Sequence, residues 1–241
     1  MTLQVPAPPD PRSPEALRHL GIILDGNRRW ARHHGLPSSA DGHSAGFGKI
    51  PEVLTWCTEL GIEVITLWML SDDNIAHRST AELEDLYRID EEVIAQLTRA
   101  GSWRLRHIGR SELLPERLVK VLRDAEHVTR HRPGPWVNLA IGYGGRSDLL
   151  SAVRTLLHDV KAGAAPEAAV DRLAEYLSTA GQPDPDLILR TSGEYRTSGF
   201  LLWQAALAEW YFCDRLWPDF TRDDLITAVD TYRRRHRRLG S

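Results

Sequence analysis

His19-Leu20-Gly21-Ile22-Ile23-Leu24-Asp25-Gly26-Asn27-Arg28-Arg29 is the stretch that decides the fold of this 241-residue chain. A short apolar run, typical of a buried β-strand, stops at the turn sequence Asp25-Gly26-Asn27 and is followed by two arginines. The pattern recurs along the chain, where further strand-like runs stop at polar or glycine-containing turns. These turns are Ser71-Asp72-Asp73-Asn74, Gly142-Tyr143-Gly144-Gly145-Arg146 and Arg190-Thr191-Ser192-Gly193-Glu194-Tyr195-Arg196.

The segments between these runs have apolar residues three and four positions apart, which is the spacing of an amphipathic helix. Strands that alternate with amphipathic helices indicate a parallel sheet. We therefore expect an α/β fold, a single domain over 19–241 with a central, mostly parallel sheet covered by helices, preceded by a flexible, proline-rich leader over 1–18. The expected strands are 19–24, 62–70, 104–108, 136–141 and 185–190, with a strand pair or strand–helix unit at 201–204 and 209–212, and the expected helices are 44–60, 80–99, 114–130, 147–161, 167–179 and 221–236.

Composition excludes several classes of protein. With 30 Lys+Arg against 33 Asp+Glu the net charge is −3, which argues against a general nucleic-acid-binding protein. No run approaches the roughly 20 apolar residues that cross a bilayer, so we expect a cytoplasmic protein with at most peripheral membrane contact. The two cysteines, Cys57 and Cys213, are too few for a disulfide scaffold or, by themselves, a zinc site. The glycine motifs of P-loop and dinucleotide-binding proteins are absent, which disfavours a nucleotide-binding α/β protein.

The turns place charge outside the carboxyl ends of strands, where parallel sheets bind ligands. Guanidinium groups bind phosphate bidentately, and Mg²⁺ commonly takes one or two carboxylates together with phosphate oxygens. Glu209 stands in the apolar run 203–212, where an ionised carboxylate is costly unless it is paired or metal-bound. The pattern therefore predicts a site for Mg²⁺ and a diphosphate. Its candidate residues are Asp25, Glu194, Glu209, Arg28, Arg29, Arg190 and Arg196.

Taken in order, these segments resemble the signature regions of the cis-prenyltransferases, the undecaprenyl diphosphate synthase family. The resemblance extends from His19 to Gly240. It implies condensation of an allylic diphosphate with isopentenyl diphosphate to form a Z double bond, with Mg²⁺ as cofactor and a hydrophobic tunnel leading from the diphosphate site. The matching stretches are His19–Ala31, Gly42-His43 followed by Gly46, Tyr143–Arg146, Asp186–Glu209 and Trp217–Phe220.

The resemblance also implies roles for individual residues. Asp25, Asn27 and Asn74 are expected to be catalytic, and Asp25 and Glu209 to bind the metal. Met69 is expected to limit product length, because a flexible thioether there would fill the tunnel into which the chain grows. The residues expected to bind substrate are Gly26, Arg28, Arg29, Trp30, His43, Ser71, Arg190, Arg196 and Ser198.

Product and assembly follow from the same resemblance. We expect a short product, (2Z,6E)-farnesyl diphosphate made from geranyl diphosphate. The C-terminal Arg238-Leu239-Gly240 implies a homodimer in which this segment reaches the neighbouring subunit's site.

Two departures from the family pattern leave alternatives open. The arginine usual shortly before Gly42-His43 is missing, and the turn after Ser71 carries His77 and Arg78, so that its arginine is shifted by one position. Which basic residue completes the diphosphate clamp therefore stays open. So do an enzyme that couples prenyl units irregularly or from dimethylallyl diphosphate, a medium- or long-chain synthase, and a catalytically silent subunit of a partner prenyltransferase.

Overall fold

The computed structural model describes residues 16–163, 165 and 170–235. Within them, six strands form one sheet in the order β3-β4-β2-β1-β5-β6, and every strand pair is parallel. The predicted α/β domain with a mostly parallel sheet is confirmed. The strands are β1 (His19–Ile23), β2 (Val64–Ser71), β3 (Arg104–Ile108), β4 (Trp136–Tyr143), β5 (Leu187–Arg190) and β6 (Glu209–Phe212).

Side-chain caps define where several helices begin. Ser38 and Thr221 each form a capping box with the aspartate three residues further on, which satisfies backbone N–H groups that the first turn leaves free. The α-helices are α1 (Asn27–His33), α2 (Ser39–Gly48), α3 (Ile50–Glu59), α4 (Asp72–His77), α5 (Thr80–Arg99), α6 (Glu116–Thr129), α7 (Gly145–Lys161) and α9 (Arg222–Arg234), and the 3₁₀ turns are η1 (Ser111–Leu113), η2 (Leu173–Tyr176), η3 (Gln204–Leu207) and η4 (Trp217–Asp219).

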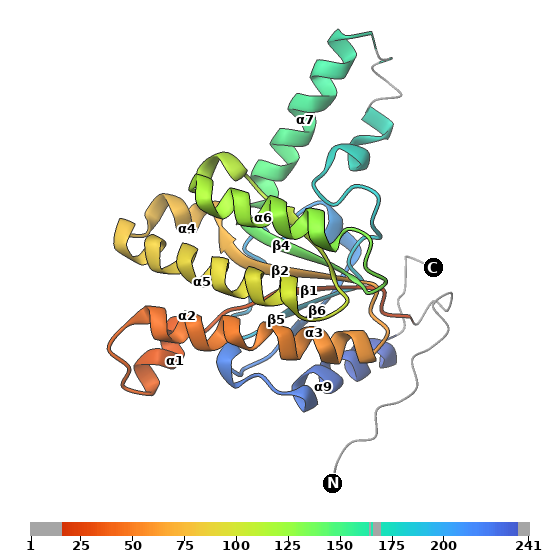
Figure 1. Cartoon of the computed structure of the whole chain (residues 1–241). Coiled ribbons are helices and arrows are strands. Elements are labelled where there is room, and N and C mark those ends of the chain that lie inside the picture. Colours follow the sequence, from red (N-terminus) through yellow and green to blue (C-terminus); the bar gives the residue numbers. More distant parts are fainter. Residues whose placement is uncertain (1–15, 164, 166–169, 236–241) are drawn as a thin grey trace.

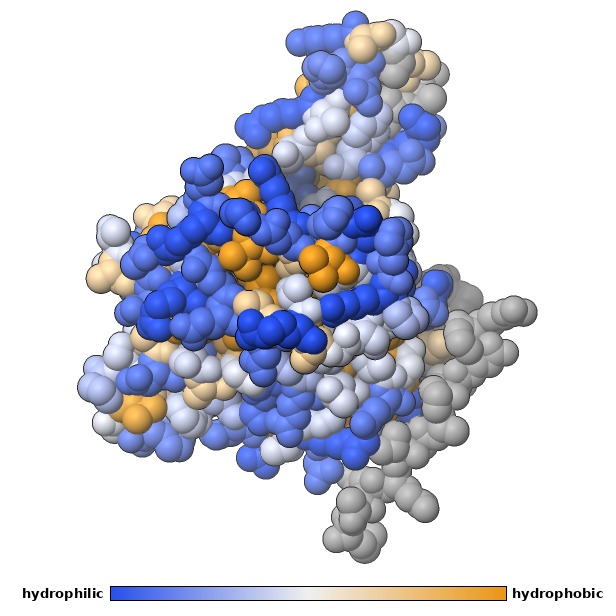
Figure 2. All heavy atoms as spheres, in the orientation of Figure 1, coloured by the Kyte–Doolittle hydropathy of each residue, from blue (hydrophilic) through white to orange (hydrophobic). Residues whose placement is uncertain are grey.

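The two faces of the sheet are covered differently. A large apolar cluster joins one face to α2, α3, α5, α6 and α9, and Figure 1 shows α2, α3, α5 and α6 side by side in front of the strands. A smaller cluster covers the other face, where Phe200, Leu201 and Ala205 from an irregular segment pack on Ile23 and Ile188. Helix α7 projects away from the body of the molecule (Figure 1). The surface seen from this side is mainly hydrophilic, with small hydrophobic patches (Figure 2).

Several predicted boundaries are corrected by the structure. The expected helix 44–60 is two helices, α2 and α3, because Pro51 lacks a backbone N–H and starts a new helix after Lys49. The expected strand 201–204 is absent, since Leu201 has a φ of +47° and the turn η3 follows it. Of the expected helix 167–179, residues 173–176 form the turn η2, and 166–169 lie outside the described residues.

Two residues of the segment predicted as a flexible leader, 1–18, are packed in the structure. Ala16 and Leu17 are buried, at 8% and 5% exposure. Residues 1–15 lie outside the described residues, as does the predicted dimer segment Arg238-Leu239-Gly240. Among the described helices, none combines the length and the apolar character that a membrane span requires.

Candidate active site

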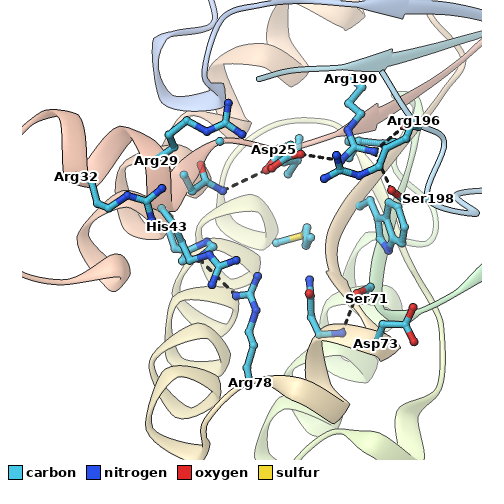
Figure 3. A pocket seen from close by; sticks show the side chains of 18 residues that line it. Asp25, Arg29, Arg32, His43, Ser71, Asp73, Arg78, Arg190, Arg196 and Ser198 are labelled. Carbon is cyan, nitrogen blue, oxygen red and sulfur yellow. Dashed lines mark hydrogen bonds and ion pairs between the residues drawn. The ribbon is translucent and has the colours of Figure 1, made fainter. Parts of the chain in front are cut away.

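A pocket of about 410 Å³ opens at the carboxyl edge of the sheet (Figure 3). The ends of β1, β2 and β5 meet there with α1 and α2, at the place where parallel sheets bind ligands. Its lining comprises Ile23, Leu24, Asp25, Gly26, Asn27, Arg28, Arg29, Arg32, His43, Trp68, Met69, Ser71, Asp73, Asn74, Arg78, Arg190, Arg196 and Ser198.

Asp25 and Arg190 form an ion pair in this pocket. Nη2 of Arg190 lies 2.7 Å from Oδ2 of Asp25, and the arginine side chain is only 4% exposed. Its Nη1 donates hydrogen bonds to the hydroxyl of Ser198 at 2.9 Å and to the carbonyl oxygen of Arg196 at 2.6 Å. The guanidinium is therefore held in one orientation, and its buried Nε has no partner among the described residues.

A surface carboxylate holds two further arginines at the same side of the pocket. Oε1 of Glu194 pairs with Arg29 at 2.7 Å, and its other oxygen pairs with Arg196. Hydrogen bonds from Arg29 and Arg196 lower the pKa of Glu194, which keeps the carboxylate ionised. Arg29 also donates to the carbonyl oxygen of Ser192, so both arginines are tied to the turn that follows β5.

The other wall carries a second cationic group around His43 (Figure 3). Nη1 of Arg78 lies 3.5 Å from Nε2 of His43, and Glu82 pairs with Arg78 at 3.3 Å and with Arg28 at 3.7 Å. Burial, reinforced by the charges of Arg78 and Arg28, lowers the pKa of His43 to about 3. The imidazole is therefore neutral near pH 7, and the positive charge of this wall comes from its arginines.

Two glycines explain how His43 reaches the pocket. A Cβ on Gly42 would stand 2.1 Å from the carbonyl oxygen of Asn27, and one on Gly46 would stand 2.1 Å from Oδ1 of Asn27. Only residues without a side chain allow α2 to approach α1 this closely. The spacing of Gly42, His43 and Gly46 thus sets the contact between the two helices.

Short helices replace two of the turns expected from the sequence. Gly26, with a φ of +113°, bends the chain after β1 directly into α1. Ser71 caps α4 by accepting a hydrogen bond from the backbone N–H of Asn74 at 3.0 Å. Helix α4 then delivers Asn74 and Arg78 to the pocket from one turn.

Most of the predicted site residues meet in the pocket, and three lie outside its lining: Glu194, Trp30 and Glu209. Trp30 lies outside the pocket lining: its indole N–H donates to Oδ1 of Asp219 at 2.7 Å, and its ring packs on His34 with the centroids 4.1 Å apart. The role of Trp30 in binding substrate stays a prediction, because α1 carries this residue outside the lining of the pocket. Glu194 is paired with the pocket residues Arg29 and Arg196, and Glu209 is the third exception.

Glu209 lies where the strands begin, whereas Asp25 lies where they end. It begins β6 and pairs with Leu187 at the start of β5, while Asp25 follows the end of β1. The register places Leu187 beside Leu20, so the two carboxylates are about five residues, or roughly 16 Å, apart along the strands. Glu209 is 30% exposed and pairs with Arg235 at 2.8 Å. Within one chain Glu209 therefore lies far from Asp25, and its role as a metal ligand stays a prediction.

The pocket offers a metal ion few protein ligands. No group of three or more His, Cys, Asp or Glu side chains that could hold a metal occurs in the part of the chain that the structure describes. Asp25 is the carboxylate that stands among the arginines, and Asp73 lines the pocket as well. One or two carboxylates suit Mg²⁺ only when a bound diphosphate supplies the remaining oxygens, which is the usual way that this ion binds.

Arg32 is a pocket residue that the sequence-based prediction missed. It stands four residues after Arg28 on α1, and residues at that spacing share one face of a helix. The four-residue spacing of Arg28 and Arg32 was therefore visible in the sequence. It indicates a shared face only once the segment after Asp25 is known to be a helix. Arg78, whose role the sequence left open, also lines the pocket with its side chain 13% exposed.

A parallel sheet whose carboxyl ends gather six arginines and the carboxylate of Asp25 in one pocket is typical of an α/β protein that binds phosphate groups. The family model described as putative undecaprenyl diphosphate synthase matches residues 23–240. The chain belongs to this family and is a cis-prenyltransferase, as its motifs predicted.

Individual relatives are similar over almost their whole length. A (2Z,6E)-farnesyl diphosphate synthase of Thermobifida fusca is 49% identical over 229 residues, covering 92% of this chain and 89% of the relative. Isoprenyl transferase 1 of Streptomyces avermitilis is 46% identical over 230 residues, with 93% and 89% covered. The crystal structure of lavandulyl diphosphate synthase from Lavandula x intermedia, in complex with dimethylallyl diphosphate, matches with a TM-score of 0.86 at 34% identity, covering 93% of this chain and 98% of that one.

Proposed function

We propose that this protein condenses geranyl diphosphate with isopentenyl diphosphate to give (2Z,6E)-farnesyl diphosphate. The observation that carries this proposal is the division of the pocket into two cationic groups, with Met69 in its apolar lining. Two diphosphate-bearing substrates need two such groups, and a bulky side chain at Met69 favours a short product. The similarity to a (2Z,6E)-farnesyl diphosphate synthase of Thermobifida fusca supports the same product.

The two groups divide between the substrates. Arg190, Arg196 and Ser198, joined by the hydrogen bonds of Arg190, suit the diphosphate of isopentenyl diphosphate. Gly26, Arg28 and His43 surround the allylic diphosphate, and Arg29, which Glu194 ties to the side of the pocket that carries Arg190 and Arg196, is assigned to the same diphosphate. We place Arg78 and Arg32 in this second group, where Arg78 takes over the task of the arginine missing before Gly42.

Charge stabilisation on the leaving diphosphate is the main chemical task. Ionising the allylic C–O bond leaves negative charge that oriented guanidinium groups stabilise without further reorganisation. Mg²⁺, bound through Asp25 and the diphosphate, would supply further positive charge to the leaving group. Asn27 and Asn74 carry amides, which are not bases near pH 7, so we assign them to orienting the group that accepts the proton.

Product analysis with three primers tests the proposal. The purified protein is supplied with Mg²⁺, radiolabelled isopentenyl diphosphate and either dimethylallyl, geranyl or (E,E)-farnesyl diphosphate. The proposal expects (2Z,6E)-farnesyl diphosphate from geranyl diphosphate and loss of activity with a chelator. Long polyprenyl products would contradict the short-chain proposal, a branched product from dimethylallyl diphosphate alone would indicate irregular coupling, and an inactive pure protein would indicate a silent subunit.

A homodimer in the cytoplasm is part of the proposal. β6 is an edge strand of the sheet, and the segment that leads to it exposes Trp203 at 46% and Leu207 at 73%. On α7, Leu150 and Leu157 are 55% and 51% exposed and stand seven residues apart, on one face of the helix. Exposed apolar side chains of this kind suit a second copy of the chain.

Light scattering with size-exclusion chromatography tests the assembly. We expect a dimer for the natural sequence and a monomer for the double variant Leu150→Asp and Leu207→Asp. The exposed Val128→Asp on α6 serves as a control that leaves the dimer intact. A monomeric natural sequence would overturn this part of the proposal.

A further inference from the structure

Asp72, the first residue of α4, is a carboxylate to which the reaction described above gives no task. Helix α4 is six residues long and has no buried residue. Isolated helices shorter than about 12–15 residues are marginal in water, so the position of α4 depends on its contacts with the rest of the molecule. That position matters, because Asn74 and Arg78, which line the pocket, stand on α4 and directly after it.

A hydrogen bond joins Asp72 to the start of α7. Oδ2 of Asp72 accepts from the hydroxyl of Ser147 at 2.6 Å, and the carbonyl oxygen of Gly144, at 2.8 Å, shares the same proton. Oδ1 of Asp72 accepts from the backbone N–H of Asp73 at 2.9 Å. A Cβ on Gly144 would clash with both oxygens, so the carboxylate packs directly on the backbone of this glycine. Asp72 therefore has one partner on its own helix and one on α7.

The order of the strands explains why the two helices meet. β2 and β4 are parallel neighbours, and Ser71 pairs with Tyr143 where both strands end. Helix α4 follows β2, and α7 follows β4, so the two helices start beside each other. Gly144 gives α7 no side-chain cap, and a carboxylate near the start of a helix is favourable. The start of α7 thus stabilises the negative charge of Asp72.

The first turn of α7 is itself firmly held by other parts of the chain. Gly145 is buried, and a Cβ there would clash with the carbonyl oxygen of Gly199. Later in the same turn, Asp148 accepts hydrogen bonds from the backbone N–H of Ser178 at 3.1 Å and from the side-chain amide of Gln204 at 3.2 Å. A hydrogen bond from this turn to Asp72 therefore fixes the start of α4 against a rigid neighbour.

Other contacts of α4 define its orientation less. Ile75 is partly buried against the large apolar cluster, and apolar packing has no preferred direction. At the far end, Arg78 pairs with Glu82 at 3.3 Å and approaches His43, but this guanidinium is the group that has to turn toward a bound diphosphate. The bond between Asp72 and Ser147 is directional, and it acts at the end of α4 that no substrate displaces.

We propose that Asp72 is a positioning residue that, through Ser147, holds α4 so that Asn74 and Arg78 face the allylic diphosphate. Asp72 is absent from the pocket lining, so it acts through these two residues and not on the substrate. The proposal rests on the function proposed above, which places Arg78 at the allylic diphosphate. Arg190 stands on β5, away from α4, so the effect is expected for one of the two substrates.

Steady-state kinetics of variants at both ends of the hydrogen bond test the proposal. Asp72→Ala and Ser147→Ala are each expected to raise KM for geranyl diphosphate about three- to tenfold, as loss of one hydrogen bond implies, and to change KM for isopentenyl diphosphate by less than about twofold. The double variant is expected to be no worse than either single variant, because the two side chains act through one bond.

Two further variants complete the set. Asp72→Asn keeps an oxygen that can accept from Ser147 and is expected to stay close to the natural KM. Asp85→Ala removes an exposed carboxylate of α5 that pairs with Arg88, and it serves as the matched control with natural Michaelis constants.

Each outcome decides for or against the role of Asp72. Unchanged constants in the single variants, equal rises for both substrates, additive effects in the double variant, or an Asp72→Asn variant as impaired as Asp72→Ala would overturn the proposal. Calorimetric titration with geranyl diphosphate alone separates it from the proposed function. If the natural sequence forms another product, that function fails, but weaker binding by Asp72→Ala and Ser147→Ala still supports the role of Asp72. A natural sequence that does not bind geranyl diphosphate would overturn both.

Discussion

Nη2 of Arg190, at the end of β5, lies 2.7 Å from Oδ2 of Asp25, which follows the neighbouring strand β1. In the function proposed above, the pair joins two chemical requirements of the reaction, an anchor for diphosphate and a ligand for the metal ion. Because Arg190 is also bonded to Ser198 and to the backbone of Arg196, its orientation is set before substrate arrives. Donors fixed in advance are the ones that stabilise developing charge most effectively.

Replacement of Asp25 tests this relationship directly. We expect Asp25→Asn to lower kcat/KM about 100-fold or more, because the metal loses its carboxylate and Arg190 its counter-ion. Steady-state kinetics at saturating Mg²⁺ measure the change. Asp219→Asn, which removes the charge of a carboxylate outside the pocket while keeping an oxygen that can accept from Trp30, should leave the rate nearly unchanged. Equal effects of the two substitutions would show that Asp25 has no special role.

Arg78→Ala tests the assignment of the shifted arginine. Loss of a hydrogen bond to a charged group should raise KM for the allylic diphosphate about tenfold or more, with little change in KM for isopentenyl diphosphate. Arg88→Ala removes an exposed arginine of α5 and serves as the matched control. An equal rise in both Michaelis constants would argue that Arg78 supports the pocket as a whole.

The close contact between α1 and α2 predicts that alanine substitutions at two glycines of α2 have different effects on the free energy of unfolding. A Cβ on Gly46 would stand 2.1 Å from Oδ1 of Asn27 and 2.7 Å from the ring of Trp217, whereas one on Gly48 meets nothing within 4 Å. Gly46→Ala should lower the free energy of unfolding by about 1–3 kcal/mol and reduce activity. Gly48→Ala should leave stability unchanged or raise it slightly. Urea unfolding of the two variants provides the comparison, and equal stabilities would refute it.

In the proposed function, Met69 limits the length of the product by its volume. Met69→Ala should shift the products toward longer chains, because it opens space in the apolar lining of the pocket. Leu70→Ala, at the next position of β2, removes a comparable volume from a buried residue that does not line the pocket. Chromatography of the dephosphorylated products distinguishes them. An unchanged product from Met69→Ala would exclude volume at this position as the limit.

A buried histidine at the other end of β1 predicts acid sensitivity of the fold. His19 is 0% exposed and bonded through Nδ1 to the carbonyl oxygen of Pro183 at 2.7 Å and through Nε2 to Thr66 at 2.8 Å. Burial lowers the pKa of His19 from 6.5 to about 4. The unfolded chain therefore takes up the proton first, so that stability is fully present above pH 6.5 and falls as the pH drops toward 4.

The expected loss from His19 alone is about 3 kcal/mol, since one pKa unit corresponds to about 1.4 kcal/mol. The pKa of His43 and of His107 is lowered as well, so the whole protein should lose more. Urea unfolding between pH 7.5 and pH 5 measures the slope. His19→Gln should be less stable near neutral pH and should show a shallower slope. A slope identical to that of the natural sequence would exclude His19 as the source.

The sequence predicted those parts of the site that directly follow strands, because the carboxyl ends of parallel strands meet on one side of the sheet. Asp25, Ser71 and Arg190 each follow an apolar run, and parallel strands bring such positions together. The expected segment 209–212 is a strand, but only the sheet shows that it runs parallel to β5, which puts Glu209 at the end of the strand away from the pocket. Trp30 lies outside the pocket lining because the segment after β1 is a helix, a feature that the sequence pattern did not indicate.

The sequence by itself determined the alternation of strands and helices, the polar turns at the strand ends and the choice of arginine for diphosphate, because these depend on local periodicity and on residue chemistry. Only the tertiary structure decided that Arg78 joins His43, that Glu209 pairs with Arg235 away from the pocket, and that Asp72 accepts a hydrogen bond from Ser147. These relationships depend on strand order, register and the packing of helices on the sheet. Such features arise from contacts between residues far apart in the chain, which no local pattern records.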